Sequence, residues 1–119
     1  MTETAQHHKI NYLEFTTNNI EFCKKFYGAV FGWQFKDWGP DYIDCTEEHS
    51  GLAIGFTKGD TQPGKSAPLA VLYSTDLAAT EAAILANGGS ITLPTFEFPG
   101  GRRFHFSDGA GNILGVWSK

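Results

Sequence analysis

Cysteine is scarce in this sequence, and positive charge is outnumbered by negative charge. The two cysteines, Cys23 and Cys45, form no C-x-x-C pair and follow no secretory signal, so we interpret both as reduced residues of the core. Nine Lys and Arg against 13 Asp and Glu give a formal net charge of -4. Binding to nucleic acid needs a basic face, so this balance argues against a nucleic-acid partner.

Long apolar runs are also absent. No stretch approaches the roughly 20 residues that a helix needs to cross a bilayer, so we expect no membrane partner. The start of the chain, MTETAQHHKI, lacks the basic beginning and the apolar centre of a signal peptide. A length of 119 residues suits one domain with a single core. We therefore expect a cytoplasmic protein of one domain.

The first patterned segment is KINYLEFTT at residues 9–17, whose side chains alternate as in a half-buried strand. Alternation puts Leu13 and Phe15 on one face, which we expect to pack against a helix. Tyr12 and Glu14 then point to the opposite, concave side of the sheet.

A helix is predicted in NNIEFCKKFYGAVFG, residues 18–32, because its apolar residues recur at helical spacing. Asn18 followed by Glu21 has the spacing of a capping box, and Gly32 suits a left-handed cap at the C-terminal end. The aromatic stretch FYGAVFGW is then the last part of an amphipathic helix, followed by entry into a strand at Trp33.

The second half of the chain repeats this order. PLAVLYSTD is a predicted strand that ends at a helix cap, Asp76, and LAATEAAILANGG is a predicted helix that ends in a glycine pair. Asn19 and Asp76 lie 57 residues apart, as do Gly32 and Gly89. The matching stretches GLAIGF and GNILGV lie 60 residues apart. Such self-similarity at half the chain length indicates a duplicated unit.

Each unit is predicted to run strand, helix and then three strands, with the helix on one face of the sheet and a cavity at the other. TKGDTQPGKSAP, rich in Gly, Pro and Lys, indicates a linker. We therefore place the modules at 9–57 and 68–118 with a linker at 58–67, and interpret TEEHSG as a solvated turn. The later strands are expected at 33–37, 41–46 and 51–57 in the first unit and at 90–98, 102–107 and 112–118 in the second.

With EFCKKFYGAVFGWQF in its first unit and FPGGRRFHFSDGAGNILGVW in its second, the chain resembles the vicinal oxygen chelate superfamily. Glyoxalase I, bleomycin resistance proteins, fosfomycin resistance enzymes and extradiol dioxygenases share this fold. The resemblance runs from Ile10 to Trp117 and implies an α+β fold whose mixed sheets curl into a cup around a central site. It does not fix the reaction, because one fold hosts many functions.

In metal-dependent members of this superfamily, His, Gln or Glu ligands stand in the first and the last strand of each unit. The resemblance carries these positions over to Tyr12, Leu69, Gly55 and Gly115. None of these residues binds a metal in the usual way, so we expect neither a metal nor another cofactor. His7 and His8 form a tempting pair, but adjacent side chains of an extended chain point in opposite directions.

The side chains expected in the cup are aromatic and apolar with a few polar groups, as a small-molecule site requires. Glu14 lies in mid-strand and, if buried, is a candidate general base; the alternative is a hydrogen bond at the rim. His105, between Phe104 and Phe106, is a candidate for proton transfer; the alternative is a satisfied strand histidine. The candidate ligand-binding residues are Tyr12, Val71, Tyr73, Arg103 and Trp117.

Three hypotheses follow. We favour a metal-free binding protein of the glyoxalase/bleomycin-resistance type that holds a small organic molecule in an aromatic cup. The alternative is an enzyme, a lyase, isomerase or hydrolase, that uses Glu14 or His105 as its acid or base, with or without an unconventionally held metal. A third possibility is an accessory module whose cup is filled by a partner chain. In every case we expect a homodimer, because dimerisation hides surface that a small sheet domain exposes.

Overall fold

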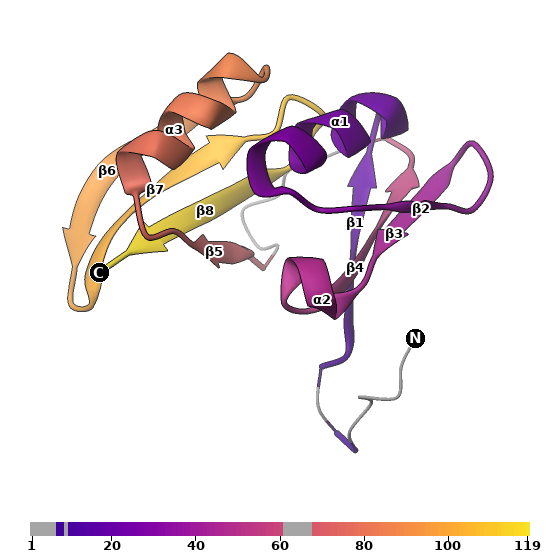
Figure 1. Ribbon diagram of the computed structural model, residues 1–119, viewed down its shortest axis with the longest axis horizontal. Coiled ribbons are helices and arrows are strands. Elements are labelled where there is room, and N and C mark those ends of the chain that lie inside the picture. The colour runs from indigo at the N-terminus through magenta and orange to yellow at the C-terminus, as the bar shows by residue number, and fades with distance from the viewer. Residues whose placement is uncertain (1–6, 9, 61–67) are drawn as a thin grey trace. The chain divides into compact units, whose positions relative to one another are not determined.

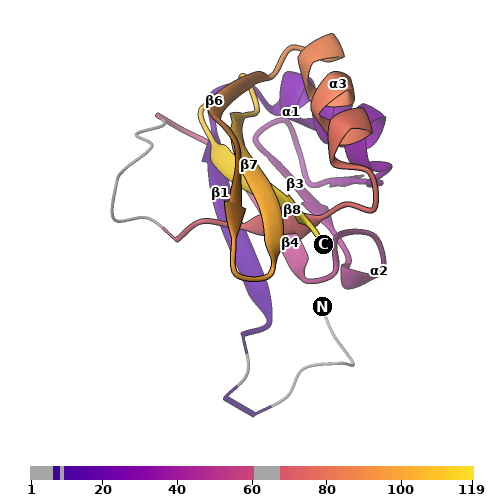
Figure 2. The ribbon, with the colours of Figure 1, turned by 90° about the vertical axis from the view of Figure 1, so that its left-hand side faces the viewer.

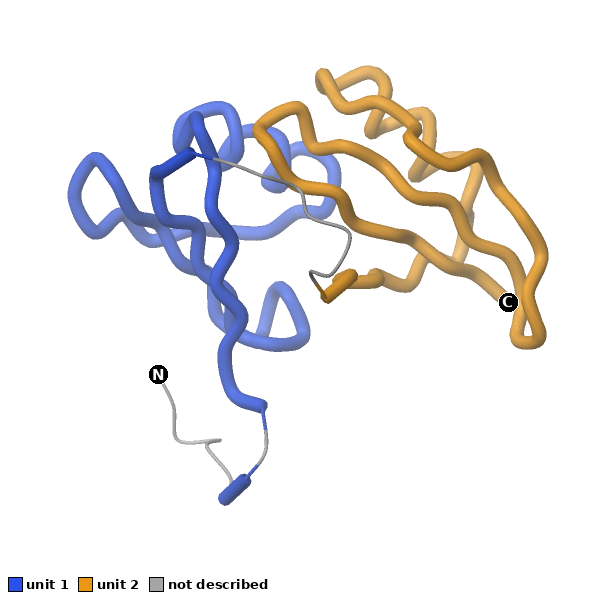
Figure 3. The backbone as a smooth tube through the Cα atoms, turned by 180° about the vertical axis from the view of Figure 1, so that it is seen from behind, with its two compact units in different colours: residues 1–60 blue, residues 61–119 orange. Residues whose placement is uncertain are grey.

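The computed structural model describes residues 7–8, 10–60 and 68–119, and the chain divides into two compact units, 1–60 and 61–119 (Figure 3). Each unit contains a four-stranded mixed sheet with a helix over one face (Figure 1). This arrangement confirms the predicted α+β fold of two βαβββ modules. Among the described residues, no helix has the length and apolarity that crossing a membrane requires.

The sheet of the first unit has the order β1-β4-β3-β2. Strand β1 pairs with β4 in parallel, and the other neighbours are antiparallel, so β1 forms one edge of the sheet. The elements of this unit are β1 (Tyr12–Thr17), α1 (Ile20–Phe31), β2 (Lys36–Asp37), β3 (Tyr42–Cys45), α2 (Glu47–Ser50) and β4 (Ala53–Lys58).

Helix α1 begins one residue later than the predicted capping box. Its N-cap is Asn19, whose backbone is extended and whose side chain accepts a hydrogen bond of 3.0 Å from the amide of Phe22. The box predicted from Asn18 and Glu21 is therefore wrong: the residue three places after the true cap is Phe22, whose apolar side chain cannot complete it. The C-terminal cap is confirmed, with Gly32 at φ 75°.

Aromatic packing joins α1 to its sheet. Tyr27 is fully buried, stacks on Trp33 at 5.1 Å between ring centroids and contacts Phe56 of β4 at 5.0 Å. Phe26 and Tyr27 of the stretch FYGAVFGW are therefore core residues in the last part of an amphipathic helix, as predicted. Cys23 and Cys45 are free and buried, which confirms them as core residues.

Besides the capping box, two local predictions in this unit are wrong. Paired strand covers only Lys36–Asp37 of the predicted 33–37. Trp33 and Phe35 lie before it, and their rings contact Tyr27 and Phe56 of the aromatic core. The predicted solvated turn at 46–51 is a single turn of helix, α2, in which the carbonyl of Thr46 accepts the amide of His49 at 3.0 Å. Two glutamates in its first turn favour this helix, because carboxylates stabilise the positive end of the helix dipole.

The sheet of the second unit has the order β5-β8-β7-β6, with β5 and β8 parallel (Figures 1 and 2). The helix of this unit, α3, has Asp76 as its N-cap, as predicted. The Asp76 side chain accepts a hydrogen bond of 3.1 Å from the amide of Ala79. The predicted strand at 90–98 is confirmed with the same bounds. The elements are β5 (Val71–Tyr73), α3 (Leu77–Ala86), β6 (Ser90–Phe98), β7 (Gly101–Ser107) and β8 (Ile113–Ser118).

Strand register shows the duplication directly. Glu14 of β1 lies opposite Gly55 of β4, and Val71 of β5 lies opposite Gly115 of β8. These two pairs are related by the sequence steps of 57 and 60 residues, so the units share one pairing scheme. The face of each sheet that its helix leaves uncovered is called the open face below.

Candidate functional site

The side chains of strand β7 alternate between the two faces of the second sheet. Phe104 and Phe106 are fully buried on the side of α3, whereas Arg103 and His105 are only partly buried and alternate with them. The predicted orientation of His105 is therefore confirmed. Antiparallel pairing sets Arg103 opposite Trp117 of β8 and His105 opposite Gly115, which brings all four residues to the open face.

Aromatic rings cover much of this open face. Trp117 contacts Tyr73 of β5 at 4.8 Å and Phe98 of β6 at 6.1 Å between ring centroids, in both cases edge to face. Edge-to-face pairs match the positive edge of one ring to the negative face of the other, which holds the rings at defined angles. The result is an aromatic surface drawn from three strands.

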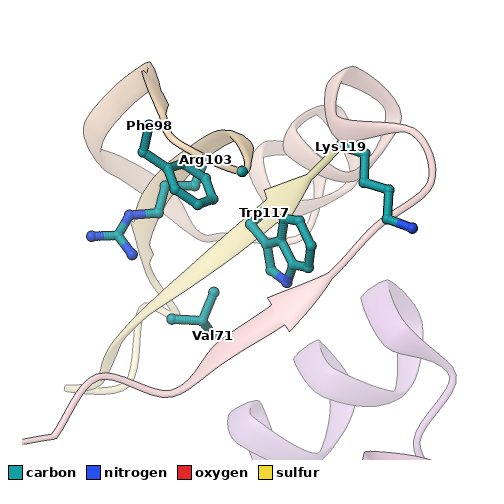
Figure 4. A pocket seen from close by; sticks show the side chains of 6 residues that line it. Val71, Phe98, Arg103, Trp117 and Lys119 are labelled. Atoms are coloured by element: carbon teal, nitrogen blue, oxygen red, sulfur yellow. The ribbon is translucent and has the colours of Figure 1, made fainter.

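A pocket of about 510 Å³ opens on this surface, within the second unit (Figure 4). Apolar groups form most of its wall, and the polar groups are two cationic side chains. Val71, Arg103 and Trp117 of the predicted ligand-binding set border it, and Tyr73 lies beside it against Trp117. The lining residues are Val71, Phe98, Gly100, Arg103, Trp117 and Lys119.

The guanidinium of Arg103 lies over two phenylalanine rings of β6. The central carbon of its guanidinium lies 5.2 Å from the ring centroid of Phe96 and 5.5 Å from that of Phe98, the geometry of cation–π contacts. Its Nε is buried and has no hydrogen-bond partner among the described residues. A buried donor without a partner is costly, so this atom is an exception to the usual pairing of buried polar groups.

His105 lies against the backbone of β8, with Phe96 at 6.0 Å from its ring. Its Nε2 is buried and also lacks a hydrogen-bond partner in the part of the chain that the structure describes. Burial, and then the positive charge of Arg103, lower the pKa of His105 below its usual value of 6.5. The imidazole is therefore neutral at physiological pH.

The open face of the first unit has a different character. Tyr42 donates a hydrogen bond of 3.0 Å to Oε1 of Glu14, and its oxygen also meets the hydroxyl of Tyr12. A phenol has a single proton to donate. Since Tyr42 gives its proton to Glu14, Tyr12 donates to Tyr42, and the Tyr12 oxygen is left as an acceptor at the end of the chain.

Both phenols are held in their protonated form. Burial raises the pKa of Tyr42 far above its usual value of 10.0, and the hydrogen bonds to Tyr12 and Glu14 act in the same direction. Burial also raises the pKa of Tyr12, against the opposite effect of its bond to Tyr42. Glu14 itself is exposed, so the burial on which its role as a general base was conditional is not met, and its hydrogen bond from Tyr42 matches the alternative of a hydrogen bond at the rim. It lies on the edge strand β1, where only one neighbouring strand covers it.

The family's metal positions do not fit a metal here. At Gly55 the place of a side chain is taken by the hydroxyls of Tyr12 and Tyr42, with which a Cβ atom would collide. At Gly115 a Cβ atom would lie 3.2 Å from Cδ2 of His105. Within residues 7–8, 10–60 and 68–119, no three His, Cys, Asp or Glu side chains come together to hold a metal ion.

The two N-terminal histidines correct another expectation. The rings of His7 and His8 stack at 3.8 Å rather than pointing apart, because His8 has a left-handed backbone with φ 64° and the chain turns there. Both are exposed.

The structure gathers five of the seven candidate residues on one face and places the other two elsewhere. Val71, Tyr73, Arg103, His105 and Trp117 share the open face of the second unit, and Tyr12 and Glu14 belong to the first. Sequence reasoning missed Phe96, Phe98 and Tyr42. The alternation in FEFPGGRRF places both phenylalanines across the hairpin from Arg103 and was a usable signal, whereas nothing in the sequence pairs Tyr42 with Glu14.

The family model for the glyoxalase/bleomycin resistance protein/dioxygenase superfamily matches residues 9–116. The chain therefore belongs to this superfamily, as its sequence motifs indicated. No curated protein matches the chain significantly.

Solved structures share the fold at low sequence identity. A glyoxalase-related enzyme from Fulvimarina pelagi has a TM-score of 0.79 and 18% identity over 94% of this chain and 88% of its own. A family enzyme from Burkholderia phytofirmans has a TM-score of 0.75 and 17% identity, covering 92% and 98%. The fosfomycin resistance protein FosX from Listeria monocytogenes has a TM-score of 0.78 and 13% identity, covering 96% and 95%. Their likeness establishes the fold and leaves the activity open.

Proposed function

We propose that this member of the superfamily works without a metal and binds a small organic molecule on the open face of its second unit. The observation that carries the proposal is the pocket bordered by Phe98, Arg103 and Trp117, which combines aromatic wall with a few polar groups. The absence of metal-binding side chains at Gly55 and Gly115 supports a mode of binding that needs no ion.

Unpartnered polar atoms support the same proposal. Nε of Arg103 and Nε2 of His105 are buried on this face without partners among the described residues. Buried polar groups in folded proteins are hydrogen-bonded in most cases, so exceptions need an explanation. The explanation we propose is a bound molecule that pairs with these atoms once the two side chains shift toward it.

Metal content is the first measurement. The protein, with His7 and His8 replaced by alanine, is dialysed against chelator and offered zinc, nickel, manganese and ferrous iron. We expect that no stoichiometric metal binds when these ions are added back. A panel of aromatic, cationic and peptide-like molecules should then be screened for an increase in the melting temperature of the protein. Retention of one metal per chain, or failure of the whole panel, would contradict the proposal.

The hydrogen-bond chain on the first unit favours an enzyme as the second candidate. A donor bound at Tyr12 would connect through Tyr42 to the carboxylate of Glu14, which then serves as the final proton acceptor. His105, neutral at physiological pH, is the other candidate acid or base. Glu14→Gln keeps the shape and removes the acceptor, so unchanged turnover of an identified substrate by this variant would remove Glu14 from the candidates.

We also propose a cytoplasmic homodimer. Ile10, Trp38, Leu69 and Leu85 are large hydrophobic residues that stay more than a third exposed in the single chain, and dimerisation is a common way to cover such surface. Sedimentation at micromolar concentration tests the dimer, and a monomer there would contradict it.

A further inference from the structure

We propose that the ligand of the second unit is a planar aromatic anion, such as an aromatic carboxylate. This inference rests on the proposed binding function and adds the chemical class of the molecule. It follows from the charges around the pocket, the position of Arg103 and the angle between two rings.

The charge around the pocket is positive although the whole chain is negative. Of the six lining residues, Arg103 and Lys119 are cationic and none is acidic, whereas the formal net charge of the chain is -4. Neither cation forms an ion pair with any residue that the structure describes. The ion pair found among the described residues joins Lys24 to Asp37, in the first unit. An anion that enters the pocket therefore meets the guanidinium of Arg103 and the ammonium of Lys119, with no acidic side chain among the lining residues.

Arg103 is preorganised to receive that anion. The rings of Phe96 and Phe98 lie against its guanidinium at 5.2 and 5.5 Å, which restricts its plane before any ligand arrives. In Figure 4 its side chain runs along Phe98 and the guanidinium extends past the ring. A fixed guanidinium offers parallel N–H donors that match the two oxygens of a carboxylate.

The rings beside Arg103 favour a flat partner. Phe98 and Trp117 meet at 68°, so a planar molecule can lie on the face of one ring while the edge of the other touches it. A volume of about 510 Å³ leaves room for a fused ring system together with its acidic group. Lys119 is exposed at the border of the same pocket and adds positive charge without a fixed geometry.

The test compares three probes of similar shape and different charge: naphthoate, naphthamide and naphthylmethylamine. Binding to the full chain is measured by titration calorimetry at low and at high salt. We expect naphthoate to bind about tenfold more tightly than naphthamide, as a charge-assisted hydrogen bond predicts. The amine should bind most weakly, and salt should weaken naphthoate in particular.

Arg102 provides a matched control for Arg103. Arg102 is the preceding residue of β7 and points to the opposite face of the sheet. Arg102→Met and Arg103→Met each remove one positive charge, so the two variants differ only in the face that loses it. We expect Arg103→Met to weaken naphthoate about tenfold and to leave naphthamide nearly unchanged. Arg102→Met should alter neither, and Arg103→Lys should fall between because it lacks the planar fork.

Several outcomes would overturn the inference. Equal affinity for naphthoate and naphthamide, with both weakened by Trp117→Leu, rejects the anion and leaves the proposed binding function standing. No binding of any probe rejects the ligand class, and failure of the wider panel as well rejects the function. A change in sedimentation caused by Arg103→Met would show instead that a second copy of the chain covers this face.

Discussion

The hydroxyl of Tyr42 donates a hydrogen bond of 3.0 Å to Oε1 of Glu14, across strands that are not neighbours in the sheet. Strand β4 lies between them, and it carries Gly55 at the crossing point. The bond exists because this position has no side chain. Without Gly55, the Tyr42 ring could not reach the edge strand.

Tyr42→Phe should lower stability modestly. The change removes the donor to Glu14 and the acceptor for Tyr12, and the site is partly exposed, so we expect a loss of about 1 kcal/mol in the free energy of unfolding. Urea unfolding measures it. Tyr73→Phe is the control, since no hydrogen bond of its hydroxyl is found in the described structure; an equal loss there would contradict a specific role for the Tyr42 bonds.

The raised pKa of Tyr42 should make the stability of the protein depend on pH in the alkaline range. Because burial raises its folded pKa above the unfolded value of 10.0, the unfolded chain releases this proton first, and the stabilisation present below that pH is lost as the pH rises further. Unfolding free energies followed upward from about pH 9 should fall more steeply in the wild type than in Tyr42→Phe. Parallel curves for the two proteins would argue against the raised pKa.

His105 should titrate below its usual pKa of 6.5, first because of burial and then because of Arg103. The folded state resists protonation of His105, so the neutral imidazole contributes to the stability of the folded state above the pKa of an unfolded histidine. This contribution is lost as the pH falls from that value through the lower pKa of the folded state. Proton NMR of the imidazole follows the titration directly. Arg103→Met should raise the pKa part of the way, while Arg102→Met should have a much smaller effect.

Gly55→Ala should disturb the first unit more than Gly115→Ala disturbs the second. A methyl group at Gly55 collides with two tyrosine hydroxyls, and we expect a loss of about 1–3 kcal/mol. At Gly115 the nearest atom, Cδ2 of His105, lies 3.2 Å away and has only to shift slightly. In Tyr42→Phe the penalty at Gly55 should shrink, because one colliding oxygen is gone; a double-mutant cycle of unfolding free energies measures this.

Asp108 should be costly to remove from the turn that joins β7 to β8. Its buried carboxylate accepts hydrogen bonds from the amides of Ala110 at 2.7 Å and Asn112 at 3.1 Å. Asp108→Ala leaves these donors unsatisfied, and we expect a loss of about 2–4 kcal/mol. Chemical unfolding tests this, with Asp60→Ala as a control at an exposed position.

The sequence predicted the fold well because the fold depends on local signals that occur twice. Helix caps such as Asp76 and Gly32 and the alternation around His105 are read from a few adjacent residues. The cap at Asn19 was missed by one place because two asparagines adjoin there. Helix α2 was missed because a single turn has too few residues to show a helical period.

The candidate site was predicted less completely, for a physical reason. Contacts such as those of Arg103 with Phe96 and Phe98 depend on the register of a hairpin that contains bulges. The pairing of Tyr42 with Glu14 depends on a strand order that the sequence does not state. Glu14 is exposed and lies on the edge strand β1, and this edge position is likewise a property of the whole sheet.

Alternate side chains of β7 lie on opposite faces of the sheet and can have different roles. Phe104 and Phe106 pack on the helix side, while Arg103 and His105 lie on the open face, where we propose that the ligand binds. Changes at the second pair leave the helix-side packing untouched, so such a chain can acquire a new ligand through a few substitutions while it continues to fold. A family that reuses this scaffold for many small molecules can diversify in this way, one open face at a time.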